Sequence, residues 1–126
     1  MINLLKYKEI INRNVMHIAT VNKNDNPNLA VATNVLVLDE NKIIISINEM
    51  INTQENVQYN KNVVLTVFEK KDKGLRLFGT AKFYKSGKYY DLCKKEFFPN
   101  GKISPCGATK PKGAMIITIL RVEEYK

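Results

Sequence analysis

The segment that decides the fold runs from Lys42 to Phe68 and reads K-I-I-I-S-I-N-E-M-I-N-T-Q-E-N-V-Q-Y-N-K-N-V-V-L-T-V-F. Residues 42–48 and 63–68 are β-branched runs, and a polar stretch separates them. This pattern predicts a strand, a short helix and a second strand. Because side chains alternate along a strand, both faces of the first strand are expected to be at least partly covered. Its faces carry Ile43, Ile45 and Ile47 on one side and Ile44 and Ser46 on the other.

The polar stretch between the two strands has the signature of a helix N-terminus. Asn52 can cap the helix, and Glu55 stands three residues later, as in a capping box. A helix N-terminus presents free N–H groups and the positive end of the helix dipole, which suits a phosphate. The same two residues also fit an ordinary capped connecting helix, which is the commoner explanation of a cap on its own. Both interpretations stay open at the level of the residues.

Length and composition predict one globular domain over residues 1–126. Hydrophobic residues make up 44% of the chain and charged residues 25%, which is ordinary for a globular protein. No apolar run is long enough to span a membrane. The first residues show no secretory cleavage signature, so a cytoplasmic location is expected.

The chain is basic, with a formal net charge of +8. Such a charge is compatible with nucleic-acid binding. However, nearly all of it is lysine spread along the chain, whereas base readout and bidentate phosphate contacts favour arginine. The arginines are Arg13, Arg76 and Arg121. The composition therefore favours a solvated basic surface and disfavours nucleic acid as a partner.

Residues suited to metal binding or to nucleophilic catalysis are scarce. Cys93 and Cys106 lack metal-ligand spacing, and we expect both to be plain thiols, with no metal site. His17 is the single histidine and stands mid-strand with Val15 and Ala19 on its face, an apolar setting typical of a structural residue. No catalytic residue can be named. If the protein is an enzyme, a bound cofactor must supply the reactivity.

The remaining pattern predicts a mainly β protein, a small antiparallel barrel with flanking helices. Between 75 and 84 one face is expected to carry Gly79 and Ala81, whose small side chains leave room for a close neighbour. A helix is expected after a Ser86 cap, and an irregular loop over 98–113. The other expected helices begin at residue 2 and at residue 52, and the six expected strands span 15–21, 29–38, 42–48, 63–68, 75–84 and 114–123.

Four stretches, taken in order, resemble the pyridoxamine 5′-phosphate oxidase-like family of FMN-binding split barrels. The first is H-I-A-T-V-N-K-N-D-N-P-N-L-A-V-A-T-N-V over 17–35. The second is the segment around 45–67, where Thr53, Asn56 and Asn60 keep the spacing of the family's K-T-x-x-N-x-x-x-N motif. The third is L-R-L-F-G-T-A over 75–81, and the last is the closing strand A-M-I-I-T-I-L-R-V-E-E-Y. The resemblance covers most of the chain except the 98–113 loop.

This resemblance implies a six-stranded antiparallel split β-barrel that forms a homodimer, with FMN in the groove between the subunits. The flavin would transfer hydride or electrons from a donor to an unidentified small-molecule acceptor. The implied cofactor-binding residues fall into three groups. These are Ala32, Thr33 and Asn34 beside the isoalloxazine ring, Ser46, Ile47 and Asn48 along the ring and ribityl chain, and Asn52, Thr53 and Asn56 at the phosphate.

The chain departs from the family pattern at the phosphate. Asn52 stands where such proteins often carry lysine, so a charge-assisted contact is lost. Backbone N–H groups, Thr53 and a lysine elsewhere such as Lys61 are expected to compensate. Arginines that grip the substrate phosphate in authentic pyridoxamine phosphate oxidases are also missing. A small reductase acting on another substrate fits the chain better.

Two alternatives remain. In the first, the same fold is a binding module without redox turnover, for a flavin, a deazaflavin or haem. In the second, a basic barrel binds nucleic acid, with Phe78, Tyr84 and Tyr89 near lysines to stack on bases.

Overall fold

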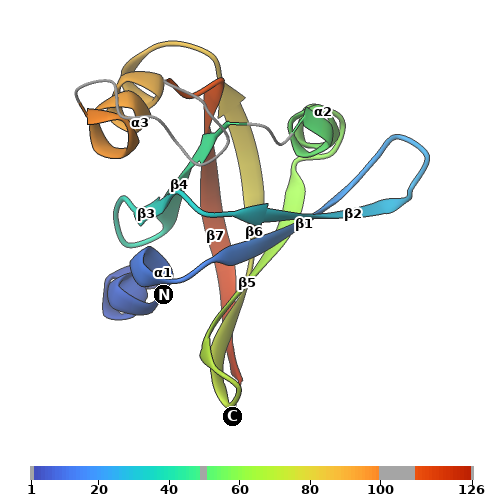
Figure 1. Ribbon diagram of the computed structural model, residues 1–126. Coiled ribbons are helices and arrows are strands. Elements are labelled where there is room, and N and C mark those ends of the chain that lie inside the picture. Colours follow the sequence, from blue (N-terminus) through green and yellow to red (C-terminus); the bar gives the residue numbers. More distant parts are fainter. Residues whose placement is uncertain (1, 49–50, 100–109, 126) are drawn as a thin grey trace.

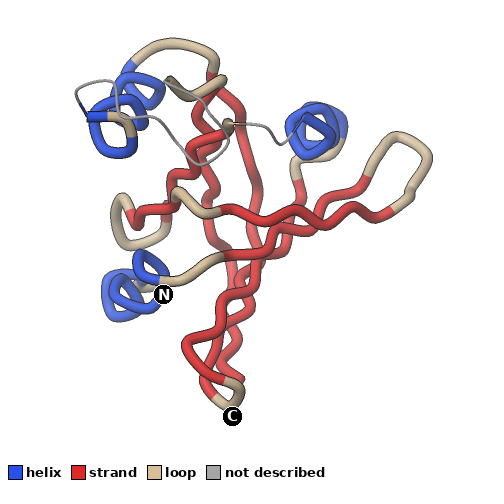
Figure 2. Tube along the Cα trace, viewed as in Figure 1, coloured by secondary structure: helices blue, strands red, loops and turns tan. Residues whose placement is uncertain are grey.

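The structure is a computed structural model that describes residues 2–48, 51–99 and 110–125. Its strands form one antiparallel sheet that curls on itself, with helices at its ends and on one side (Figures 1 and 2). The helices are η1 (Leu4–Tyr7), α1 (Lys8–Arg13), α2 (Ile51–Tyr59) and α3 (Lys88–Phe97). The strands are β1 (Met16–Val21), β2 (Pro27–Ala32), β3 (Val35–Val37), β4 (Lys42–Ile47), β5 (Asn62–Lys70), β6 (Lys73–Tyr84) and β7 (Gly113–Tyr125).

The order of strands in the sheet is β2-β1-β5-β6-β7-β4-β3. The two edge strands, β2 and β3, are consecutive in the chain, so the short link of Thr33 and Asn34 passes from one edge to the other. At the end of this link the Ser46 N–H donates to the Asn34 carbonyl at 3.0 Å, which continues the pairing of β3 with β4 by one residue. The sheet therefore folds back until its two edges meet, which is the geometry of a half-closed barrel.

The prediction of one strand over 29–38 is wrong, and the sheet has seven strands instead of six. β2 pairs with β1, with Ala32 opposite Met16, whereas β3 pairs with β4, with Val35 opposite Ile45. One straight strand cannot bond to both edges of the sheet. The run breaks at Thr33 and Asn34 for this reason, although its apolar pattern continues across the break.

The main hydrophobic core fills the inside of the curl. Alternation along β4 is confirmed, because Ile43, Ile45 and Ile47 are buried in this core while Ile44 lies in a second cluster outside it. Leu4 and Ile11 from the N-terminal helices and Val57 from α2 belong to the main core. These helices lie at different places around the sheet (Figure 1). α3 covers the outer face of β4 and β7 and contributes Cys93 to the second cluster.

The start of α3 differs from its prediction. The N-cap residue is Gly87, and no side chain caps the helix there, so the Ser86 cap is wrong. Gly87 has φ of +97°, a left-handed conformation that glycine adopts without a steric penalty. This turn places Ser86 one residue too early to reach the first helical N–H groups. Of the predicted 98–113 loop, residues 100–109, including Cys106, lie outside the described residues.

The small residues of β6 make the close approach that the sequence predicts. A Cβ atom added at Gly79 would lie 2.3 Å from the Thr118 carbonyl oxygen of β7. A register shift between Phe78 and Gly79 marks a bulge at the same point. Gly79 is thus needed where β6 and β7 come closest.

We expect Gly79→Ala to lower the free energy of unfolding by about 1–3 kcal/mol, because backbone must move to admit the methyl group. Thr80→Ala is the control, since Thr80 is the next residue on the half-buried outer face. Urea unfolding measures both. Equal stability of Gly79→Ala and the parent protein would contradict the close approach.

Candidate functional site

A buried polar corner lies where the β1–β2 hairpin meets α2. The Asn56 side-chain Nδ2 donates to Thr20 Oγ1 at 3.0 Å, and Asn28 Nδ2 lies 3.4 Å from Thr53 Oγ1. Thr20 and Asn28 are cross-strand partners in β1 and β2. The hairpin and the helix therefore meet through four hydrogen-bonding side chains at a position where apolar residues are more usual.

The sequence of α2 explains why this corner is polar. Thr53, Asn56 and Val57 are spaced so that they share the inward face of the helix, and all three are buried. Only Val57 joins the hydrophobic core. A buried amide or hydroxyl without a partner costs about 1–3 kcal/mol. Within the described residues no buried side-chain polar atom lacks a hydrogen bond, so the corner is a satisfied network.

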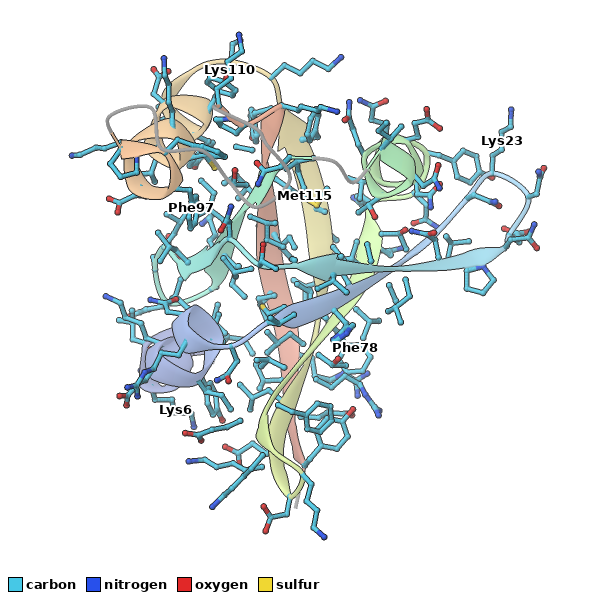
Figure 3. The ribbon with its side chains drawn as sticks, viewed as in Figure 1. Lys6, Lys23, Phe78, Phe97, Lys110 and Met115 are labelled. Carbon is cyan, nitrogen blue, oxygen red and sulfur yellow. The ribbon has the colours of Figure 1, made fainter. Side chains whose placement is uncertain are left out.

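A hollow of about 400 Å³ opens directly above this corner. Lys23 extends from the tip of the β1–β2 hairpin, the upper right of Figure 3, and lines the hollow. From α2 come Asn52 in the first turn, Glu55 and Asn56. The remaining lining residues are Asn22, Asn24, Pro27, Asn28 and Tyr59. The ammonium group and the N–H groups of several side-chain amides can donate hydrogen bonds to an oxyanion such as phosphate, and the lining contains one carboxylate, Glu55.

The structure brings the three residues predicted at the phosphate to this place. Asn52 and Asn56 line the hollow, and Thr53 is buried beneath it. Asn52 is not the helix cap, since α2 begins at Ile51 and no hydrogen bond joins Asn52 to Glu55 in the described part of the chain. The two residues before Ile51 lie outside that part. Asn52 is the second described residue of α2, and its side chain is exposed and available to a ligand.

The residues predicted beside the ring lie at the crossing between β2 and β3. Ala32 is buried, and its side chain belongs to the main core. Thr33 is exposed and Asn34 half-buried, with the Asn34 carbonyl engaged by Ser46. The structure therefore offers the Thr33 and Asn34 side chains to a ligand and leaves the Ala32 side chain covered.

The residues predicted along the ribityl chain divide between the two sides of β4. Ile47 lies in the main core. Ser46 is buried on the opposite side, where its Oγ donates to Asn48 Oδ1 at 3.1 Å and also contacts the Cys93 thiol under α3. Asn48 is half-buried at the end of the strand. Ser46 is thus occupied with α3 and Asn48.

Sequence reasoning missed Thr20, Lys23 and Asn28. The turn at Asn24 to Pro27 could have indicated these residues, because it defines a hairpin whose strand ends lie beside α2. Lys61, predicted to compensate for the missing lysine, does not line the hollow and lies in a separate groove beside β6. The lysine that lines the same hollow as Asn52 is Lys23, on the hairpin tip.

Other kinds of site are not found in the described part of the chain. No three His, Cys, Asp or Glu side chains there come together to hold a metal ion. No helix there is long and apolar enough to cross a membrane.

Comparison with known proteins bears on the polar corner and the curled sheet together. The family model described as pyridoxamine 5'-phosphate oxidase matches residues 6–122. The chain belongs to this family. Members of the family are split barrels, and the match spans every strand of the sheet up to Val122 in β7.

Three relatives illustrate the likeness. An uncharacterised protein of Methanocaldococcus jannaschii, MJ0282, is 33% identical over 114 residues, covering 89% of this chain and 73% of that protein. The structure of HupZ from Group A Streptococcus has a TM-score of 0.83 and 26% identity, covering 98% of this chain and 94% of that one. An FMN-binding protein from Syntrophomonas wolfei has a TM-score of 0.77 at 18% identity, covering 98% and 82% respectively, and supports the fold alone.

Cys93 gives a test of the packing on the outer side of β4. Burial raises the pKa of the Cys93 thiol to about 12, and this effect outweighs the hydrogen bond with Ser46, which lowers the pKa. In a Cys106→Ser protein, Cys93 is the single thiol, and we expect no reaction with a thiol reagent near pH ~8 until urea unfolds the chain.

The same pKa predicts a loss of stability in alkali. The unfolded thiol ionises near pH 9.0 and the folded thiol near 12, so the folded state holds the extra proton between them. The free energy of unfolding should fall across that window. Adding Cys93→Ala to the Cys106→Ser protein should flatten this dependence. Fast native labelling of Cys93 would refute the packing.

Proposed function

We propose that this chain is a cytoplasmic FMN-binding oxidoreductase of the pyridoxamine 5′-phosphate oxidase family, acting on a substrate other than pyridoxamine phosphate. The observation that carries the proposal is the hollow beside the first turn of α2. Asn52 and Asn56, which the family pattern implies at the flavin phosphate, come together in its wall. When bound, the flavin supplies hydride or electron transfer between a donor and a small-molecule acceptor.

The side chains around the hollow would bind the phosphate as donors. Lys23 supplies the positive charge that the chain lacks at Asn52, and the Asn28 and Asn52 amides supply neutral hydrogen bonds. The first-turn N–H groups of α2 add the positive end of the helix dipole. Thr20 and Asn56 hold the hairpin and the helix in register, so the donors keep their spacing. Thr33 and Asn34 would orient the ring.

The test adds the missing charge instead of removing a buried residue. Thr53 and Asn56 are buried, so their loss would change folding as well as binding. Asn52 is exposed, and Asn52→Lys places an ammonium group in the wall of the hollow. A charge-assisted contact contributes about 1.5–3 kcal/mol, so FMN affinity should rise roughly tenfold or more. Flavin absorbance and fluorescence titration measure it.

Gln58→Lys is the matched control, since Gln58 is exposed on the same helix and does not line the hollow. It adds the same charge and should leave FMN affinity nearly unchanged. Equal gains in both variants would show a long-range charge effect and refute the phosphate placement. Binding of a deazaflavin or haem in preference to FMN, or no FMN uptake by either variant, would refute the cofactor.

We also propose that the protein is a homodimer through the outer face of the sheet. Two rows of cross-strand neighbours lie side by side on this face. Each row takes one residue from each of β2, β1, β5 and β6, and the two rows contain few charged side chains. Leu29 and Leu120 on this face are 67% and 64% exposed. Large apolar side chains that stand exposed on one face are typical of an interface. The rows are Leu29–Ala19–Val64–Phe78 and Val31–His17–Thr66–Arg76.

A charge on this face should prevent the association. Leu120→Glu would place a carboxylate in the apolar interface, and we expect a monomer with much weaker FMN binding, because the flavin groove needs both subunits. Leu5→Glu is the control, as Leu5 is an exposed leucine on η1. Sedimentation velocity gives the oligomeric state. A dimeric Leu120→Glu protein would contradict the proposed interface.

A further inference from the structure

A second groove, of about 440 Å³, lies on the outer face of the sheet beside α3. Its floor contains a row of polar residues that crosses three neighbouring strands. Thr118 of β7 pairs with Lys42 of β4 on one side and with Thr80 of β6 on the other. Thr118 is the single polar side chain between Ala114 and Leu120. Two hydroxyls and an ammonium group therefore stand in line across three neighbouring strands.

Three lysines from separate strands or strand ends surround this row. Lys42, Lys61 and Lys82 line the groove, and none of its lining residues in the described part of the chain is acidic. Lys42 has a loose ion pair with Asp39 at 3.7 Å. Lys61 and Lys82 form no ion pair within the described residues. Since like charges repel, an anion bound among them would be favoured.

Aromatic rings form the wall of the groove next to α3. The Tyr84 and Tyr89 rings have centroids 5.1 Å apart and are tilted by 56°. The Lys82 ammonium lies 5.4 Å from the Tyr84 ring centroid. Ile116 adds an apolar surface on the floor. The groove thus joins a basic end to a flat apolar end.

We propose that this groove binds a phosphorylated aromatic compound of mononucleotide size. The lysines and threonine hydroxyls match a phosphate, and the tyrosine rings match a flat ring. The volume lies within the range of small-molecule sites. None of the groove's lining residues lines the hollow at α2, so this is a second site, separate from the proposed flavin corner.

Three probes dissect the site. ADP carries a ring and phosphates, pyrophosphate lacks the ring, and adenosine lacks the phosphates. We expect ADP to bind more tightly than either of the others, as measured by titration calorimetry on the full chain. ADP that binds no better than pyrophosphate would overturn the aromatic part of the proposal. No ADP binding at millimolar concentration would overturn all of it.

The charge test uses exposed lysines so that folding is preserved. K61Q/K82Q should weaken ADP roughly tenfold or more, because two charge-assisted contacts are lost. K70Q/K71Q is the control, since it removes the same charge at the exposed β5–β6 end, outside the groove. An equal loss in both variants, or no loss in K61Q/K82Q, would overturn the site.

The ring test uses Tyr89→Leu, which should weaken ADP and leave pyrophosphate binding unchanged. Thermal unfolding checks that this variant is folded, and K61Q/K82Q stands as the independent test if it is not. An oligonucleotide that binds with steep salt dependence and displaces ADP from the groove would replace this proposal with a nucleic-acid surface.

Failure of this proposal can be told apart from failure of the flavin proposal. FMN also carries a phosphate and a flat ring, so the comparison uses the tighter of its binding events. K61Q/K82Q should leave the affinity of that tighter FMN binding unchanged, and Asn52→Lys should leave ADP affinity unchanged. If K61Q/K82Q instead abolished FMN binding, the groove would be part of the flavin site and the second-site proposal would be wrong.

Discussion

The two-residue link of Thr33 and Asn34 holds the two edges of the sheet together, because the strands it joins, β2 and β3, stand at opposite ends of the strand order. An antiparallel sheet of seven strands left open would expose two edges and one apolar face to water. Bringing the β2 and β3 ends together gives the sheet an inside. The large apolar core, the positions of α1 and α2, and the hairpin that reaches α2 all depend on this closure.

Closure also explains why polar groups are buried at the α2 end. The helix packs where the β1–β2 hairpin continues beyond the end of the β1–β5 pairing at Ala19 and Val64. Asn56 and Thr53 fill that space with hydrogen bonds to the hairpin. Each such bond contributes about 0.5–1.5 kcal/mol net, less than apolar packing of similar volume would, so the polarity of the corner suits ligand binding better than it suits stability.

The sequence predicted the features that depend on local periodicity. The two-faced pattern of β4 and the small residues of β6 are confirmed, because side-chain alternation and the space around Gly79 are properties of single strands and their neighbours. The break at Thr33 and Asn34 could not be predicted, since the apolar pattern runs through it and only the pairing of the two edges interrupts it. Lys61 was assigned to the wrong place for a similar reason: its nearness to α2 in the chain says nothing about which face of β6 it meets.

β7 is the last described strand in chain order and yet lies in the interior of the sheet, between β6 and β4. Without β7, the β4–β3 pair is not hydrogen-bonded to the rest of the sheet. The other strands then form two separate parts, β2-β1-β5-β6 and β4-β3, and each part has an open edge where β7 would pair. Such edges are prone to association with other chains. Removal of the residues from Gly113 onward would therefore separate the sheet into two parts and leave the barrel open.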